Sequence, residues 1–240
     1  MKRMLMQLRA ELMLISRNGE QLLLTLVIPV VLLAFFGSVD VLPTTGGDPL
    51  SFLVPGVLAV AVMSTSMVSL GIATGFERSY LVLKRLGATP LTRGQLVTAK
   101  VLSVFMVELV QLAVLVPIAF VLGWSPRAGH IALVVPAILL GSAAFAGIGL
   151  VLAGRMRAEL NLAAQNGIYL LLLLLGGMII PRESLPGALG SAAAALPSTA
   201  LADLLRTSFA GTGAIVAPLS VLAAWAVVAP TVAARRFRWS

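Results

Sequence analysis

Long apolar runs alternate with short polar segments along this chain, and six of the runs are long enough to cross a bilayer. A helix needs about 20 consecutive apolar residues to span the hydrocarbon layer. The pattern predicts membrane spans over residues 21–39, 52–76, 96–122, 131–154, 160–180 and 214–234. No soluble domain is apparent between them. We therefore predict one all-α integral membrane domain covering residues 1–240, with six transmembrane helices.

The first 20 residues have an amphipathic pattern instead of a continuous apolar one. Asn18 and Gly19 end this pattern, and charged residues occur throughout it, so no removable signal peptide is predicted. We expect an interfacial helix over residues 1–20. Its expected apolar face comprises Met4, Leu5, Leu8, Leu12 and Ile15, with Lys2, Arg3, Arg9 and Glu11 largely on other faces.

A basic segment, FERSYLVLKRLGATPLTRGQLVTAK, occupies residues 76–100 between the second and third spans. Its cations outnumber its single acid, Glu77, and apolar residues recur at roughly helical spacing. This pattern predicts a short helix along the membrane surface, with its cations in water, ending at Gly87. A turn around Pro90 should follow, and a new helix should begin near Arg93. On charge alone, an ordinary basic loop explains the segment equally well. The cations are Arg78, Lys84, Arg85, Arg93 and Lys100, and the apolar residues are Tyr80, Leu81, Leu83 and Leu86.

The segment over residues 181–213 contains too many polar, proline and glycine residues to cross lipid as one helix. We predict two short helices at the outer surface. Ser184 or Pro186 should open the first helix, and Pro197 or Ser198 the second. Asp203 in the first turns and Arg206 further along agree with the helix dipole.

Small and polar residues mark two of the predicted spans. Those of the second span should allow close helix packing, although substrate contact is the alternative. The amides that begin the fifth span are expected to join helices rather than bind ligands. The two sets are Ser64, Thr65, Ser66, Ser69, Gly71 and Gly75 in the second span, and Asn161, Gln165 and Asn166 in the fifth.

Composition agrees with a membrane protein and indicates its orientation. Of the residues, 59% are hydrophobic and only 11% are charged. Six spans place 14 of the 17 lysines and arginines on one side, together with both termini and residues 76–100. By the positive-inside rule that side is cytoplasmic. The net charge of +8 therefore indicates contact with anionic lipid and does not suggest nucleic acid.

Several kinds of chemistry are absent from the sequence. The chain has no cysteine, and none of its three lysines follows a glycine-rich loop, so it carries no P-loop nucleotide site. Any ATPase must be a separate chain. His130 stands alone in a predicted outer loop, so we expect no metal site and no catalytic constellation.

Glu108 is the one acidic residue predicted within a span, with Gln111 one turn later. An ionised group in lipid costs several kcal/mol unless it is partnered or hydrated. Glu108 is thus either a polar contact in a transport route or a protonated structural residue. In the second case we expect hydrogen bonds to Asn161, Gln165 or Asn166.

Taken in order, these parts resemble the type-2 ABC exporter permeases, especially the bacterial daunorubicin-resistance-like branch, over nearly the whole chain. Their loop pattern E-R-x-x-G-T-x-x-x-L-x-x-T-P-x-x-R is approximated at residues 77–93, although Ser79 and Tyr80 stand where that family has glycine. The region 181–206 is similar to the family's outer re-entrant helices. The matching residues are Glu77, Arg78, Leu83, Thr89, Pro90 and Arg93 in the loop, and Pro181, Leu185, Pro186, Leu196, Pro197 and Arg206 in the outer region.

The resemblance implies a permease subunit that is not itself an enzyme. Two such subunits, identical or paralogous, would pair in the bacterial inner membrane with two cytoplasmic ABC ATPase subunits, which would hold the ATP and Mg²⁺. The complex would export a hydrophobic or amphipathic substrate, such as a drug, lipid or polyketide-like molecule. The outer helices would form the external gate, and the segment 76–95 would receive the ATPase through a cytoplasmic coupling helix.

The resemblance also suggests roles for individual residues. The expected ATPase-coupling residues are Glu77, Arg78, Tyr80, Leu83, Lys84, Arg85, Thr89, Pro90 and Arg93. The substrate path, between the two permease subunits along the second and fifth spans, would include Ser64, Thr65, Met67, Asn166 and Tyr169, with Glu108 and Gln111 as further polar candidates.

Two other classes of function are alternatives to the exporter. An ion-coupled secondary transporter would use intramembrane carboxylates such as Glu108, and an intramembrane enzyme would need a polar catalytic cluster. With one intramembrane acid and no repeated half, the sequence favours the exporter. Arginine outnumbers lysine 14 to 3, a bias typical of GC-rich bacterial genomes.

Overall fold

The structure is a computed structural model that describes residues 2–38, 49–127, 129–179, 181 and 185–236. Every regular element within these residues is helical, which confirms the predicted all-α class. The α-helices are α1 Lys2–Arg17, α2 Gly19–Ser38, α3 Pro49–Met63, α4 Leu70–Ser79, α5 Val82–Gly87, α6 Arg93–Val121, α7 Val134–Ala153, α8 Ala158–Leu175, α9 Gly187–Ala193, α10 Pro197–Ala210 and α11 Val216–Arg236. A π-helical segment, Ser64–Ser69, joins α3 to α4, and a 3₁₀ turn, Ile131–Leu133, precedes α7.

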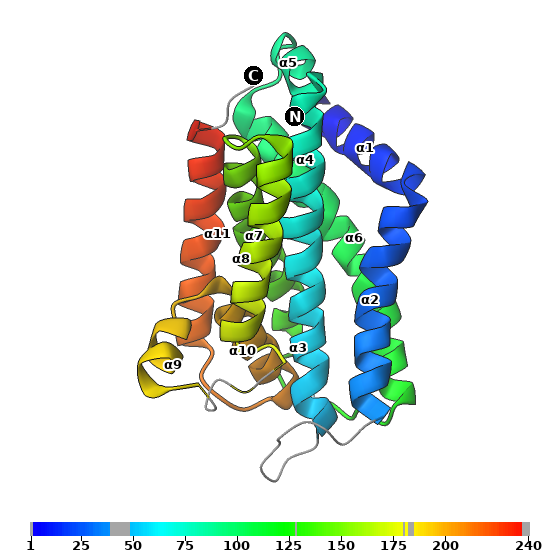
Figure 1. Ribbon diagram of the computed structural model, residues 1–240. Helices are drawn as coiled ribbons and strands as arrows, with labels where there is room; N and C mark the ends of the chain where they lie inside the picture. Colours follow the sequence, from blue (N-terminus) through cyan, green and yellow to red (C-terminus); the bar gives the residue numbers. More distant parts are fainter. Residues whose placement is uncertain (1, 39–48, 128, 180, 182–184, 237–240) are drawn as a thin grey trace.

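The long helices stand side by side in one bundle (Figure 1). Both chain termini, α1 and α5 lie at one end, here called the α5 end, and α9 and α10 lie at the other, the α10 end. Helix α7 packs against α3, α4, α6, α10 and α11 and so occupies the centre. Within the described residues, five helices are long and apolar enough to cross a membrane: 49–79, 93–121, 131–153, 158–175 and 216–236. At the first predicted span, α2 forms with a shorter apolar stretch, Thr25–Gly37. The protein is therefore a multi-pass membrane protein.

The second span is longer than predicted and is the most buried of the five. It runs unbroken through α3, the π-helical segment and α4, for 31 residues from Pro49 to Ser79. Its residues Leu53 to Met63 form the middle of the main apolar core. This span therefore supplies a large part of the surface on which α2, α7, α8 and α10 pack.

The small residues of this span permit close packing, as predicted. A Cβ atom at Gly71 would lie 2.0 Å from Nε2 of Gln165, and one at Gly75 would lie 2.4 Å from Nδ2 of Asn161. Asn161 donates to the Gly71 carbonyl at 2.9 Å, and Gln165 donates to the Gly149 carbonyl at 2.9 Å. These amides tie α8 to α4 and α7, because an amide in an apolar setting needs partners on a neighbouring helix.

The two short helices at the α10 end begin where the prolines predicted. Pro186 precedes α9, and Pro197 is the first residue of α10, where its missing N–H has no helical partner to lose. The alternative start at Ser184 lies outside the described residues. The two helices meet at a bend of 79°.

The predicted pair of short helices between the fifth and sixth spans is confirmed, and α10 is more deeply buried than its polar sequence suggests. Most of its side chains are buried, including Leu201, Leu204 and Leu205, and it packs against α3, α7 and α11. Its polar residues do not prevent burial because Arg206 donates to the carbonyls of Gly177 at 2.6 Å and Met178 at 3.0 Å. The helix therefore forms part of the core at this end.

Helix α1 is inclined to the bundle and joins α2 at an elbow (Figure 1). It packs chiefly against α6. Met4, Leu8, Leu12 and Ile15 lie on its partly buried face, as predicted, whereas Leu5 is exposed. Glu11 is also on the buried face, contrary to prediction, because it pairs with a lysine of α6 described below.

Candidate functional site

The segment between the second and third spans, residues 76–95, forms a helical tip at the α5 end (Figure 1). Helix α4 continues to Ser79, so the predicted short helix is confined to α5, which ends at Gly87 as expected. Leu81 links the two with φ of 61°, a left-handed conformation that costs a non-glycine residue about 1 kcal/mol or more. This strained residue lies where the chain turns sharply between α4 and α5.

Helix α6 begins at Arg93, as predicted, and its start is firmly capped. The Thr92 hydroxyl accepts from the Gln95 N–H at 3.2 Å, and the Gln95 side chain accepts from the Thr92 N–H at 3.1 Å. This reciprocal pair satisfies two backbone donors that a helix start leaves free. The tip is thus joined to α4 on one side and to a capped α6 on the other.

The predicted coupling residues separate into an outward and an inward set. Tyr80 is 71% exposed, and the other outward residues are also exposed to solvent: Lys84, Arg85, Thr89, Pro90 and Arg93. Leu83 is fully buried beneath α5. Arg78 turns toward the end of α7 and donates to the carbonyls of Ala153 and Met156, each at 3.4 Å. The inward residues hold the tip in place, and the outward ones are available to a partner.

Glu77 is the third inward residue, and it belongs to a buried ion cluster with Lys100 and Glu11. The Lys100 ammonium lies 3.0 Å from each carboxylate oxygen of Glu11. It also lies 3.1 and 2.9 Å from the two carboxylate oxygens of Glu77. The Lys100 side chain is 1% exposed, so the expectation that this cation faces water is wrong. Its place on the buried face of α6 brings it between α1 and α4, where two acids compensate its charge.

A further contact joins α1 to the tip. Arg3 donates to the Pro90 carbonyl at 3.1 Å, and Gln7 donates to Glu11 at 2.8 Å within α1. Together with the ion cluster, these bonds tie α1 to both ends of the segment 76–100. These contacts of α1 could not be predicted from the sequence. The one local signal is that Glu11 falls in helical phase with Leu8, Leu12 and Ile15.

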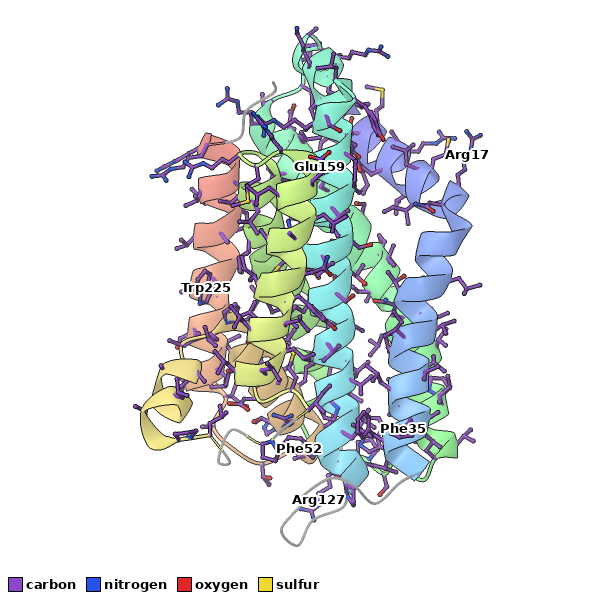
Figure 2. All side chains as sticks on the ribbon, in the orientation of Figure 1. Arg17, Phe35, Phe52, Arg127, Glu159 and Trp225 are labelled. Carbon is purple, nitrogen blue, oxygen red and sulfur yellow. The ribbon has the colours of Figure 1, made fainter. Side chains whose placement is uncertain are left out.

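Three cavities surround α2, and all of them are lined by Thr25. The first, of about 510 Å³, lies beneath the elbow of α1 and α2 and extends from the ion cluster along Leu70, Ala73, Val104 and Val107. Figure 2 shows Arg17, another of its lining residues, at this elbow. The third, of about 400 Å³, lies between α2 and α6 and reaches Gln111.

The second cavity, of about 210 Å³, is called here the α2 groove. It shares Thr25 and Ser69 with the first cavity, so the two adjoin. Its lining is uncharged and comes from α2, α3, the π-helical segment, α4 and α8: Thr25, Ile28, Pro29, Val60, Ser64, Val68, Ser69, Ile72 and Tyr169.

The predicted substrate-path residues are only partly brought together. Ser64 and Tyr169 line the α2 groove, and Thr65 lines the first cavity. Met67 is fully buried against α7, where its carbonyl faces Gly149, so its prediction as a wall residue is wrong. Asn166 is exposed on α8 and donates to the Leu162 carbonyl of its own helix at 2.9 Å.

Glu108 and Gln111 lie behind the π-helical segment. Glu108 is 2% exposed and accepts from the hydroxyls of Ser66 and Ser142, so its predicted bonds to the α8 amides are wrong. Gln111 donates to the Thr65 hydroxyl at 3.0 Å and to the Thr25 carbonyl at 2.8 Å. Two residues of α6 thus clamp consecutive residues of the π-helical segment, and one of them also reaches α2.

Comparison with known proteins identifies the family. A family model described as ABC-2 type transporter matches residues 4–210, most of the chain. The chain belongs to the ABC-2 type transporter family. A search of curated proteins found no match to this permease. Family membership implies a membrane-spanning ABC transporter subunit that works with an ABC ATPase subunit. The narrower daunorubicin-resistance-like branch stays a prediction.

The family match extends over the features that the geometry singles out in this permease. It includes α1, the tip, all three cavities around α2 and the bent pair α9 and α10, and it ends at the last residue of α10. The tip has no nucleotide-binding loop in its sequence, and its outward surface is basic and apolar.

Proposed function

We propose that this permease is the transmembrane subunit of an ATP-driven exporter of hydrophobic or amphipathic molecules. Two permease subunits and two ATPase subunits form the complex, and the ATPase subunits hold the ATP and Mg²⁺. The α5 end faces the cytoplasm of a bacterium, in keeping with the positive-inside count. The coupling residues are the outward set on the tip, centred on Tyr80, Lys84 and Arg85.

The observation that carries the proposal is the direct connection between the tip and the cavity walls. Helix α4 leads into the tip and lines the first cavity with Leu70 and Ala73. Helix α6 leaves the tip and lines the same cavity with Val104 and Val107. Because packed helices move as rigid bodies, a partner that displaces the tip also displaces both walls.

The ion cluster makes this movement a concerted one. Glu77 and Lys100 join α4 to α6, and Glu11 adds α1. A displacement of α5 would therefore carry the elbow of α1 and α2 with it, which changes the opening of the cavities on both sides of α2. Apolar walls with a few hydroxyls suit a hydrophobic or amphipathic cargo.

The structure does not favour the alternative of an ion-coupled transporter that uses Glu108. Glu108 lines none of the three cavities around α2, and both of its carboxyl oxygens have serine partners. A carboxyl enclosed in this way has no direct access to an ion in those cavities. We assign it to helix packing.

Co-purification from native membranes tests the proposal. The tagged wild-type permease should bring down a P-loop ATPase in equal amount, with ATP hydrolysis. Charge reversal on the tip, K84E/R85E, should remove the ATPase without changing membrane insertion, because both side chains are exposed. The matched control reverses Arg235 and Arg236, exposed cations of α11 at the same end.

The outcomes separate the parts of the proposal. Loss of the ATPase in K84E/R85E and its retention in the control would support docking at the tip. Equal retention in both would place the docking surface elsewhere. A wild-type permease that purifies without any ATPase would contradict the exporter as a whole.

A further inference from the structure

Two hydroxyl groups in the α2 groove have no hydrogen-bond partner among the residues that the structure describes. One belongs to Ser64, the first residue of the π-helical segment, and the other to Tyr169 in the middle of α8. Both residues are half-buried and line the same cavity of about 210 Å³. Other hydroxyls nearby are used within the protein: Thr65 bonds to Gln111, and Ser66 bonds to Glu108.

Hydroxyls that line a cavity without a partner become unfavourable once an apolar molecule displaces water from that cavity. A hydroxyl removed from water without a compensating hydrogen bond costs roughly 1–3 kcal/mol by protein mutational data. Serine usually avoids this cost in a helix by donating to the carbonyl four residues earlier, as Ser208 does to Leu204 at 2.7 Å. Ser64 and Tyr169 instead present their hydroxyls beside Ile28, Val60 and Ile72. Such a pair is typical of a pocket that positions a ligand through a few polar groups in an apolar lining.

The charge of the surroundings limits the chemistry of that ligand. None of the groove's lining residues is charged. The charged residues that line the adjoining first cavity are Glu11, Glu77, Lys100 and Arg17, and the first three are already paired with one another. An ionised group in the groove would lose its hydration without gaining a counter-charge. A neutral group that donates or accepts hydrogen bonds would lose little, because each hydroxyl can do both.

We propose that Ser64 and Tyr169 form a recognition site for an uncharged polar group, a hydroxyl or carbonyl, on a largely apolar substrate. The apolar body of that substrate lies along Ile28, Pro29 and Val60 and extends past Thr25 and Ser69 into the first cavity. This inference rests on the proposed transport function and narrows its substrate class to neutral amphipaths.

Photolabelling with three matched probes tests the site. The probes share one medium-length alkyl chain with a diazirine and differ only in the head group: alcohol, ammonium or carboxylate. The full complex is reconstituted in lipid nanodiscs, labelled, and digested for peptide mass spectrometry. Labelling of α2 and α8 groove peptides is normalised to that of lipid-facing α11 peptides.

The alcohol probe should label the groove more strongly than the other two. The double variant S64A/Y169F should reduce that labelling by about 30-fold, since it removes two hydrogen bonds that each contribute a net amount near 1 kcal/mol. The control S220A removes a hydroxyl that bonds within α11, to the Ala217 carbonyl at 2.8 Å, and should change nothing. Both variants delete only hydroxyl groups, and equal elution of the complex on size exclusion checks that they fold.

Two results would overturn the site. One is unchanged alcohol labelling in S64A/Y169F, and the other is equal groove labelling by the ammonium or carboxylate probe. The ATPase is quantified in the same samples, so the two proposals fail separately. Failed labelling with a bound ATPase rejects the recognition site alone, whereas labelling without any ATPase rejects the exporter and keeps the site.

Discussion

Replacing Lys100 by methionine should destabilise the protein more than any other single change at the α5 end. Methionine nearly preserves the volume of the side chain but removes the ammonium that four carboxylate oxygens approach within 3.1 Å. Glu11 and Glu77 would then face each other at low exposure without a cation. Removing one partner of a buried ion pair typically costs about 3–5 kcal/mol, mainly because the remaining charge stays uncompensated.

The free energy of unfolding can be followed by detergent-titrated denaturation of the purified permease. We expect K100M to lose about 3–5 kcal/mol. E11Q should lose less, because Lys100 keeps Glu77 as a partner. K84M is the matched control: the same substitution at an exposed lysine of α5 should change stability by less than about 0.5 kcal/mol.

A triple variant separates charge from packing. E11Q/E77Q/K100M removes all three charges together, so it should recover part of the stability that K100M loses. If K100M unfolds like the wild type, the cluster does not hold these helices together. If the triple variant is as unstable as K100M or less stable, lost packing and not uncompensated charge explains the effect.

Three further substitutions should have measurable effects in the same denaturation assay. G56A should destabilise by about 1–3 kcal/mol, because its Cβ would lie 1.9 Å from the Met178 carbonyl oxygen and backbone must shift; G94A, where a Cβ meets open space, is the neutral comparison. E108Q should stay near the wild type, whereas E108L should lose about 1–3 kcal/mol by leaving the Ser66 hydroxyl unpaired, since Ser142 can still donate to the Ile138 carbonyl; equal losses would show that volume alone matters. R206A should lose a similar amount, since it removes the donor to two carbonyls, and a stability unchanged from the wild type would contradict that role.

The parts of this fold that local rules govern could be read from the sequence. The apolar runs gave the helices that cross the bundle, because the length of a span is set by the bilayer itself. The turn around Pro90 predicted a helix start near Arg93, and Pro197 predicted the start of α10, because turn and first-turn prolines act within a few residues. The end of α5 at Gly87 was predicted for the same reason.

Features that depend on distant partners were missed. The bond between Lys100 and Glu11 spans 89 positions, and nothing near either residue announces the other. Lys100 was expected in water because it ends a basic run, and only the packing of α1 on α6 encloses it. The partial burial of Arg206 in α10 could not be predicted either, because the carbonyls of Gly177 and Met178 that accept from it lie 29 and 28 positions away.

The residues of the candidate site could likewise be predicted only in part. Ser64 and Tyr169 were expected on the wall because the family resemblance implies a route along the second and fifth spans, and both line the α2 groove. Met67 was expected beside them but is turned into the core. The sequence contained the residue types, and the helical geometry between residues 64 and 69 decided which of them face the cavity.

The π-helical segment also fixes the rotational orientation of α4, which follows it. A π-helical turn holds more residues than an α-helical one, and each residue turns an α-helix by about 100°. If all six residues of Ser64–Ser69 were wound as a regular α-helix instead, they would turn the chain further, and α4 would point its faces elsewhere. Glu77 would swing away from Lys100, and Gly71 and Gly75 would no longer face α8. The wide π-helical turn thus sets the rotation of α4 relative to α3. Each half of this long helix therefore faces its own set of neighbouring helices.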